Sequence, residues 1–392
     1  MGNSSPGGTP HERLILHWQA ALPSFALPAY WSRVDVPELQ ASFLEGPVGD
    51  QEVFRLAETA GALLERDRPV HALVATSDPL STSQWALDAI ALPSIWPPVS
   101  ASPVAIAVVD GGIDSGHPDV GGRVCVRGPD LTGSGWSPPL SAHGTLVAGI
   151  AAAETGNAVG IAGVANACLI DIRILDASGV GSASNLAWGI VHATKLGAKV
   201  ILLSAGGTDL PKIVRAATFY AVAHGVLLVA AAGNDGCLSG LPGTTDTVEE
   251  PAKYPEVVSV ASVGLHAGVV EPSWFSSCGS VDLAAPGEAV LSTDPPSTYA
   301  TVSGTSFAAP HVAAAAVLVW AQAPDLSALQ VRCALLAGAS PVAGGPLPHD
   351  PQTGQGILQI AGAIGATHDP AALARCAATV GLSRFNVADP IP

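Results

Sequence analysis

The sequence predicts an α/β fold with a mostly parallel central sheet, helices on both faces of that sheet, and a small N-terminal appendage. Three observations favour this architecture. From Asp78 onward, apolar runs of strand length alternate with Ala-rich helical stretches, and tight glycine-containing turns separate them. The 392 residues are also 48% hydrophobic and only 12% charged, so a large buried core can form. Sheets of this kind place their functional sites at the carboxyl ends of the strands.

The chain is expected to divide into three regions. Residues 1–77 form the appendage, 78–366 the main domain, and 367–392 a short helical tail that contains Cys376. In the appendage, apolar residues recur at helical spacing over 52–66, which predicts an amphipathic helix, and residues 70–75 suit a short strand. One helix and one strand make a small module without a catalytic constellation of its own.

The alternation in the main domain begins with the apolar run 104–109, which stops at Asp110-Gly111-Gly112 as a buried parallel strand would. Further strands are expected at 168–175, 199–203, 226–231 and 257–263, and helices at 146–153, 183–196, 216–224 and 313–321. Because Asp110, Ser204 and Asn234 all lie where strands end, we expect them at one edge of the sheet.

Charge and hydropathy restrict the partners. The formal net charge of −16 argues against nucleic acid and anionic membranes. No uninterrupted apolar stretch is long enough to span a bilayer. The nearest approach to a signal peptide, Leu14–Tyr30, follows Glu12 and Arg13 rather than a basic cluster and has no clear cleavage site. We therefore expect mature sequence and a cytoplasmic location, with secretion as the alternative.

The six cysteines leave two possibilities open. None forms a CxxC pair or has histidines at zinc-like spacing, so a structural metal cluster is not expected. The even count allows three disulfides, whereas the sparse distribution equally suits buried thiols. Neither the disulfide state nor the oligomeric state follows from the sequence.

Four polar residues suit nucleophilic catalysis. Ser306 follows Gly304 at the entry to an Ala-rich helix, whose positive N-terminus favours negative charge beside the hydroxyl. A serine nucleophile needs a base and the base needs a carboxylate, which His143 and Asp110 could supply, while Asn234 could aim an amide donor at an oxyanion. Taken singly, each is also an ordinary structural residue: a helix cap, a packing histidine or a turn former.

Three stretches together resemble the signature blocks of the subtilisin-like serine proteases, in that family's order of Asp, His and Ser: Ala107–Asp114, His143–Gly149 and Gly304–Pro310. The resemblance covers about residues 78–366. It implies a serine endopeptidase that cuts polypeptide substrates.

Roles follow from this resemblance residue by residue. Ser306 would be the nucleophile, His143 the general base and then acid, and Asp110 the carboxylate that orients the imidazole. The side chain of Asn234 and the main-chain N–H of Ser306 would stabilise the oxyanion. Phe307 stands where the family usually has methionine, and we expect no loss of activity from it.

The resemblance also implies how a substrate is held. Two strand ends would wall the pocket for the side chain before the scissile bond: Ser204-Ala205-Gly206 and Ala231-Ala232-Gly233. Gly179, in Ser178–Gly181, would belong to the edge that pairs with an extended substrate. Glu249 or Glu250 would lie near the pocket floor and favour Arg or Lys, as in a processing protease, unless both glutamates point to solvent.

Calcium and self-inhibition are two further expectations from the family. Asp78, Asp119 and Asn157 resemble the oxygen ligands of a structural Ca²⁺ site. The loop around Asn157 is one residue longer than usual, and three unrelated surface residues are the alternative. Residues 64–70 weakly resemble the end of an inhibitory propeptide, so 1–77 would be a propeptide-like or regulatory segment, and an inhibitor of the enzyme.

The sequence disfavours two other functions. An esterase of another fold is disfavoured because Gly304-Thr305-Ser306-Phe307-Ala308 lacks the second glycine of a nucleophile elbow and the triad order differs. A catalytically silent scaffold that binds peptides is disfavoured because all four catalytic side chains are present.

Overall fold

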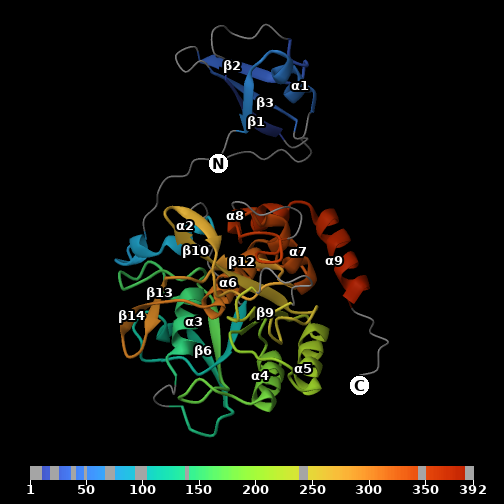
Figure 1. The fold of residues 1–392 in the computed structure, drawn as a ribbon. Coiled ribbons are helices and arrows are strands. Elements are labelled where there is room, and N and C mark those ends of the chain that lie inside the picture. Colours follow the sequence, from blue (N-terminus) through green and yellow to red (C-terminus); the bar gives the residue numbers. More distant parts are fainter. Residues whose placement is uncertain are drawn as a thin grey trace. The chain divides into compact units, whose positions relative to one another are not determined.

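The computed structural model describes residues 11–17, 26–36, 41–47, 51–66, 76–92, 104–136, 141–237, 246–342 and 350–384. The chain divides into two compact units, which we call the N-terminal unit (Met1–Ala72) and the C-terminal unit (Leu73–Pro392). Each is described by itself (Figure 1). The leader 1–10 and the strand expected at 70–75 lie outside the described residues.

The N-terminal unit is a four-stranded antiparallel sheet of order β2-β3-β1-β4 with one described helix. Leu14, Leu16 and Leu44 of the sheet are fully buried with Val53 of the helix. The elements are β1 (His11–His17), β2 (Ser32–Val36), β3 (Ala41–Pro47), α1 (Gln51–Thr59) and β4 (Leu63–Arg66). The unit therefore has its own core and more strands than the sequence predicted.

The helix predicted over 52–66 is wrong in its second half. α1 stops at Thr59, and Gly61 adopts a positive φ of 65°, a conformation that ends helices and favours glycine. Leu63 and Leu64 then pair with β1 in the sheet. Leu63 and Leu64 continue the helical spacing of α1, so this spacing alone did not show that Gly61 separates the helix from a strand.

The C-terminal unit is built on an eight-stranded sheet of order β11-β10-β9-β8-β5-β7-β6, with β12 beside β10. All neighbouring pairs are parallel except β10 with β11. The strands are β5 (Ala105–Asp110), β6 (Val124–Asp130), β7 (Cys168–Arg173), β8 (Val200–Leu203), β9 (Leu227–Ala231), β10 (Val258–His266), β11 (Val269–Pro272) and β12 (Leu283–Pro286). A separate antiparallel hairpin is formed by β13 (Val290–Asp294) and β14 (Thr298–Val302). The predicted α/β class with a mostly parallel sheet is confirmed.

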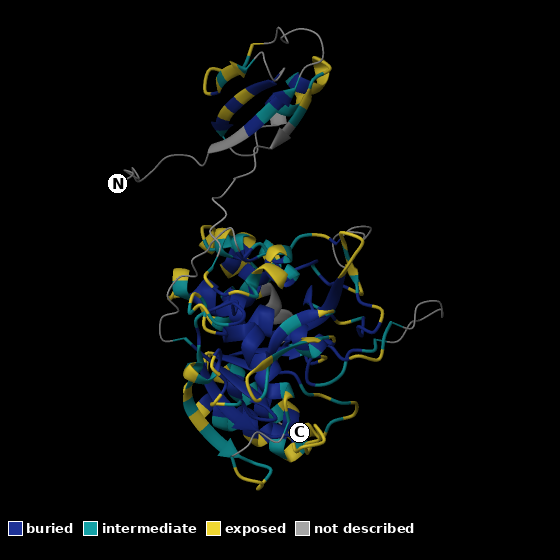
Figure 2. Ribbon diagram, turned by 90° about the vertical axis from the view of Figure 1, so that its left-hand side faces the viewer, coloured by how far each residue is buried: buried dark blue, intermediate teal, exposed yellow. Residues whose placement is uncertain are grey.

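Helices cover both faces of this sheet. The helices of the unit are α2 (Trp85–Ala89), α3 (His143–Ala152), α4 (Ala183–Lys195), α5 (Lys212–Ala223), α6 (Thr305–Gln322), α7 (Ala328–Gly338), α8 (Ile360–Ala366) and α9 (Pro370–Arg384), with short 3₁₀ turns at Ser81–Ser83 and Gly121–Arg123. The core is visible as the dark blue centre of the unit in Figure 2.

The period of two along each strand divides the core. On β5, Ile106 and Val108 pack on the side of α3 and α6, whereas Ala107 and Val109 pack on the side of α4 and α5. Every residue of β5 is buried, as the continuous apolar run predicted. No helix in the described part of the chain is long and apolar enough to cross a bilayer.

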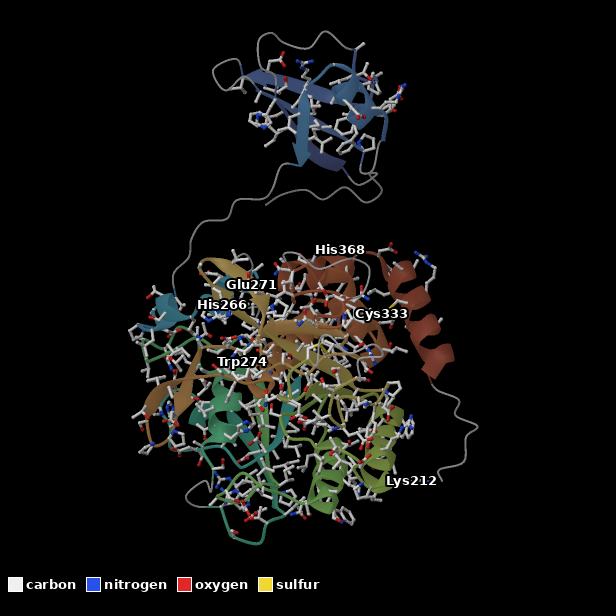
Figure 3. All side chains as sticks on the ribbon, viewed as in Figure 1. Lys212, His266, Glu271, Trp274, Cys333 and His368 are labelled. Atoms are coloured by element: carbon white, nitrogen blue, oxygen red, sulfur yellow. A yellow bond between two sulfur atoms is a disulfide. The ribbon has the colours of Figure 1, made fainter. Side chains whose placement is uncertain are left out.

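Helix α9 is packed onto this unit. Leu373 of α9 is 2% exposed and belongs to the core on the α6 side. A disulfide joins Cys333 on α7, labelled in Figure 3, to Cys376 on α9. A second disulfide joins Cys237 to Cys278, and Cys125 and Cys168 are free thiols.

Candidate active site

The three residues of the expected triad come from three ends of secondary structure. Asp110 is the last residue of β5, His143 the first of α3, and Ser306 the second of α6. β5 lies in the middle of the sheet, so its carboxyl end opens at the centre of one edge.

Asp110 and His143 form a close pair. His143 Nδ1 lies 2.9 Å from both carboxylate oxygens of Asp110, whose side chain is 1% exposed against 27% for His143. Burial of the imidazole favours its neutral form, but the charge of Asp110 and this hydrogen bond outweigh that effect, and the pKa of His143 is raised above 6.5. The arrangement leaves Nε2 available to accept a proton.

Ser306 is partly exposed and hydrogen-bonds away from the imidazole. Its Oγ donates to the carbonyl oxygen of Ser204 at 3.1 Å, and the described part of the chain contains no hydrogen bond between this hydroxyl and His143. The ring of Phe307, the next residue, lies 5.5 Å from the His143 ring between centroids. A rotation about χ1 of Ser306 is therefore needed to direct its hydroxyl to the imidazole.

Pro310 explains how Ser204 is held. A helix residue normally donates its N–H to the carbonyl four residues before it, but proline has no N–H. The carbonyl of Ser306 is thus free of that bond and instead accepts from Ser204 Oγ at 3.0 Å. The end of β8 and the first turn of α6 are joined by two reciprocal hydrogen bonds.

Asn234 is oriented by Thr305, a residue that the sequence analysis did not single out. Its Oδ1 accepts from the main-chain N–H of Thr305 at 2.9 Å and from Thr305 Oγ1 at 3.1 Å. Nδ2 is thereby the free end of the amide on an exposed side chain. The N–H of Ser306, in the first turn of α6, is one of the groups that a helix leaves without an internal partner.

A cavity of about 550 Å³ begins beside His143. Its lining includes Gly179 and the strand end Ser204-Ala205-Gly206, and its apolar part includes Leu175, Leu186 and Leu210. The three leucines were not predicted, because their positions on separate elements meet only in the folded chain.

Glu249 lies between the two expected pocket walls. A Cβ added at Gly233 would stand 2.9 Å from Glu249 Cγ, and one added at Gly206 would stand 3.4 Å from Glu249 Oε2. Its main-chain N–H donates to Ala232, between Ala231 and Gly233, at 2.8 Å. Burial, and then the charge of Asp235, raise the pKa of Glu249 above 4.5.

Glu249 has no cationic partner among the described residues. Glu250 points elsewhere, because its Oε2 accepts from the Leu210 N–H at 2.6 Å. The alternative in which both glutamates point to solvent is therefore not what the structure shows.

Behind Asp110 lies a buried polar pair that was also not predicted. Asp171 and Arg173 of β7 are both 0% exposed, and the Asp171 carboxylate accepts from the Ile113 N–H at 3.2 Å. Burial raises the pKa of Asp171 to about 7. A Cβ on Gly112 would lie 2.7 Å from Arg173 Nε, so only glycine fits this turn. The sequence feature that could have revealed this pair is the presence of two charged residues, Asp171 and Arg173, in an otherwise apolar strand.

The three expected calcium ligands also come together. Asp78 accepts from the N–H groups of Gly156 and Asn157, and Asn157 Nδ2 donates to Asp119 Oδ1 at 3.0 Å. Asp78 and Asp119 are 2% and 1% exposed, and no Lys, Arg or His side chain of the described residues forms an ion pair with them. Burial raises the pKa of Asp119, and the charge of Asp78 adds to this effect. Two buried carboxylates suit a hard cation such as Ca²⁺. The Asn157 Oδ1 accepts from the Val159 N–H at 2.7 Å, so the amide presents its Nδ2 and not its oxygen to Asp119.

Histidine and cysteine are not part of that group. Within the described ranges, no three His, Cys, Asp or Glu side chains converge as a metal cluster would require. A cation at Asp78 and Asp119 would therefore depend on a rotation of the Asn157 amide and on main-chain or water oxygens.

Comparison with known proteins gives one consistent result. Residues 101–363 match the model of the subtilase family. The chain is 42% identical to thermitase of Thermoactinomyces vulgaris over 272 residues, which are 68% of this chain and 92% of thermitase. It is 41% identical to subtilisin DY of Bacillus licheniformis over 234 residues, 58% of this chain and 81% of that protein. Among solved structures, sphericase superposes with a TM-score of 0.61 at 30% identity, over 70% of this chain and 97% of its own.

Proposed function

Because the chain belongs to the subtilase family and is a subtilisin-like serine endopeptidase, we propose that Asp110, His143 and Ser306 are its catalytic triad. His143 Nε2 takes the proton of Ser306 Oγ as the oxygen attacks the scissile carbonyl, and later returns it to the leaving amine. Asp110 holds Nδ1–H and stabilises the imidazolium. Asn234 Nδ2 and the Ser306 N–H stabilise the oxyanion.

One observation carries this assignment. The Asp110 carboxylate is almost fully buried and lies 2.9 Å from His143 Nδ1, at the mouth of a cavity that the Ser306 partner Ser204 also lines. A buried acid that faces an imidazole in this way serves to fix the tautomer in which Nε2 is the base.

Labelling with a fluorophosphonate tests the assignment. We expect one label on Ser306 of the full chain, none on S306A, and cleavage of peptide substrates only by the unsubstituted protein. A folded chain that neither labels nor cleaves would support the silent scaffold instead.

We further propose that the enzyme prefers Arg or Lys before the scissile bond, as a processing protease would. The support is Glu249, a half-buried carboxylate between the two walls of the expected pocket with no cation of its own among the described residues. A basic side chain in that pocket would supply the missing charge and form a charge-assisted hydrogen bond.

The N-terminal unit is proposed as a regulatory, propeptide-like inhibitor of the same chain. Its support is the division into two units and the separate core around Leu14, Leu16 and Leu44. Intact-mass analysis over time tests this: we expect the loss of about residues 1–77 from the active chain with a gain in activity, and no loss from S306A.

Calcium and location are proposals as well. Asp78, Asp119 and Asn157 would hold a Ca²⁺ ion, which would neutralise two buried carboxylates and stabilise the loop around Asn157. A cytoplasmic location was favoured from the sequence. The disulfides Cys237–Cys278 and Cys333–Cys376 support the alternative, secretion, because such bonds persist in oxidising surroundings.

A further inference from the structure

The Glu249 carboxylate, which lies between Gly206 and Gly233, belongs to a segment that is cross-linked to its surroundings. We call residues 246–250 the floor segment. Glu249 itself is held through its main chain, by its N–H to Ala232 O at 2.8 Å and by the Lys253 N–H, which donates to Glu249 O at 2.9 Å. Its carboxylate also interacts with the main-chain N–H of Asn234. The position of the side chain therefore depends on that contact and on what fixes the main chain on either side.

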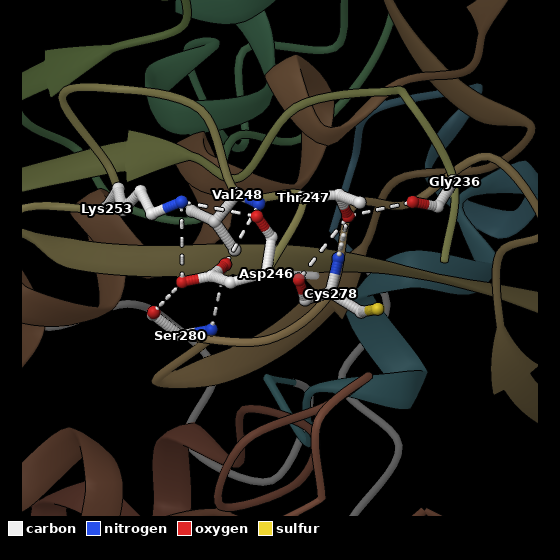
Figure 4. A network of polar contacts seen from close by, with 7 residues as sticks. All are labelled: Gly236, Asp246, Thr247, Val248, Lys253, Cys278 and Ser280. Atoms are coloured by element: carbon white, nitrogen blue, oxygen red, sulfur yellow. Dashed lines mark hydrogen bonds and ion pairs between the residues drawn. The ribbon is translucent and has the colours of Figure 1, made fainter. Parts of the chain in front are cut away.

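Thr247 fixes one side. Its N–H donates to Cys278 O at 2.9 Å, and the Cys278 N–H donates back to Thr247 Oγ1 at 2.9 Å (Figure 4). The same hydroxyl donates to Gly236 O at 2.8 Å. One side chain thus connects the floor segment to two segments, 236–237 and 278, that the disulfide Cys237–Cys278 joins covalently.

Asp246 anchors the start of the segment. Its carboxylate accepts from the Ser280 N–H at 3.2 Å and from the Ser280 hydroxyl, and lies 3.7 Å from Lys253 Nζ (Figure 4). Gly279 has a φ of 120°, and a Cβ there would stand 2.5 Å from Asp246 Oδ1. Glycine is required at this position for two reasons, the backbone angle and the closeness of the carboxylate.

The catalytic groups are held by other contacts. Asn234 is oriented by Thr305 on α6, Ser306 is tied to Ser204 on β8, and His143 is paired with Asp110 on β5. None of these bonds involves Asp246, Thr247 or the disulfide. The side chains that orient the catalytic groups thus differ from those that hold the floor segment. The two sets meet at the Asn234 loop, where Ser277 Oγ accepts from the Asp235 N–H at 3.2 Å and the Ser277 N–H donates to Gly233 O at 3.0 Å.

We propose that Thr247, Asp246 and the disulfide Cys237–Cys278 are positioning groups for substrate selectivity. They hold the Glu249 carboxylate between Gly206 and Gly233, and so set the preference for a basic side chain without taking part in bond cleavage. The inference rests on the proposed role of Glu249.

The test compares matched variants on two peptides that differ only in Arg or Phe before the scissile bond. The measured quantity is the ratio of kcat/KM for the two peptides, which does not depend on how much of a sample is folded. We expect T247V to lower the Arg/Phe ratio about tenfold and T247S, which keeps the hydroxyl, to restore it. D246N should lower the ratio in the same direction.

The two disulfides provide a second matched pair. Their cysteines are 41 and 43 residues apart, so removal of either bond should cost similar chain entropy. We expect C237S/C278S to lower the Arg/Phe ratio and C333S/C376S to leave it unchanged, while both lower the melting temperature. Brief reduction of the folded protein provides a measurement that requires no variant to fold.

The outcomes separate the two proposals. An unsubstituted enzyme without preference for Arg would overturn both the role of Glu249 and this inference. A preference for Arg that disappears in E249Q but survives in T247V and in C237S/C278S would overturn this inference alone.

Discussion

Asp110 and Glu249 are two carboxylates near the carboxyl ends of strands in one sheet, and they differ in what surrounds them. Asp110 is 1% exposed and already paired with His143 at 2.9 Å, whereas Glu249 is half-buried and has no cation among the described residues. The first pair is complete before a substrate arrives. Glu249 has no cationic partner of its own, and a substrate with Arg or Lys could supply one. If the proposed roles hold, the acid–base pair is preorganised, whereas selectivity depends on charge brought by the substrate.

The largest expected loss of activity comes from removing the charge of Asp110 from its pair with His143. D110N keeps the shape of the side chain but removes the charge and favours the wrong imidazole tautomer, so we expect kcat to fall by about 10⁴, the loss known for the same change in another Ser-His-Asp triad. Hydrolysis rates of one peptide, normalised to folded protein, provide the measurement. A loss below tenfold would contradict the role of Asp110.

A smaller effect is expected from the incomplete pair. E249Q removes a charge-assisted bond worth about 2 kcal/mol, so kcat/KM for an Arg peptide should fall roughly 30-fold while that for a Phe peptide stays near its original value. E250Q is the matched control, because the Glu250 carboxylate is already engaged with the Leu210 main-chain N–H at 2.6 Å. Equal losses on both peptides would argue against a pocket role.

The pH dependence distinguishes the two carboxylates again. His143 must be neutral to act as a base and its pKa is raised, so kcat/KM should fall on the acid side with a midpoint above pH 6.5. The pKa of Glu249 is raised above 4.5, so the Arg/Phe ratio should fall as pH decreases through a midpoint above 4.5. Because the effect of His143 cancels in the ratio, a ratio constant down to pH 4 would exclude an ionised Glu249 as the selectivity group.

Asp78 and Asp119 extend the comparison to two carboxylates that are not part of the proposed triad. If Ca²⁺ binds them at 100 times its dissociation constant, it contributes about 2.7 kcal/mol, and excess chelator should lower the melting temperature by about 5–10 °C. D119N should show no further decrease with chelator. An unchanged melt of the unsubstituted protein would count against the site.

Periodicity and motif order were enough to predict much of the C-terminal unit. The continuous apolar run before Asp110 leads to a buried strand because both faces of a parallel sheet are covered. Glycines and small residues beside His143, Asn234 and Ser306 indicate places where the backbone must turn or approach a ligand closely. Such residues can be recognised in one sequence without a structure.

What could not be predicted depends on contacts between distant residues. The strand Leu63–Arg66 was predicted to be helical, because its pairing with β1 depends on distant residues and not on the spacing of its own apolar residues. Thr305 as the anchor of Asn234 and Leu186 as part of the cavity lining follow only from the folded chain. Likewise, an even cysteine count could not distinguish two bonds from three.

Pro310 has a consequence for how the enzyme moves. Because the Ser306 carbonyl accepts from Ser204 Oγ rather than from an N–H of its own helix, the first turn of α6 stays linked to the end of β8 even when the Ser306 hydroxyl turns toward His143. A displacement of α6 would therefore also move Ser204, which lines the cavity beside His143. In P310A, residue 310 would have a main-chain N–H that can donate to the Ser306 carbonyl in place of Ser204 Oγ. The link between α6 and the end of β8 would then be lost.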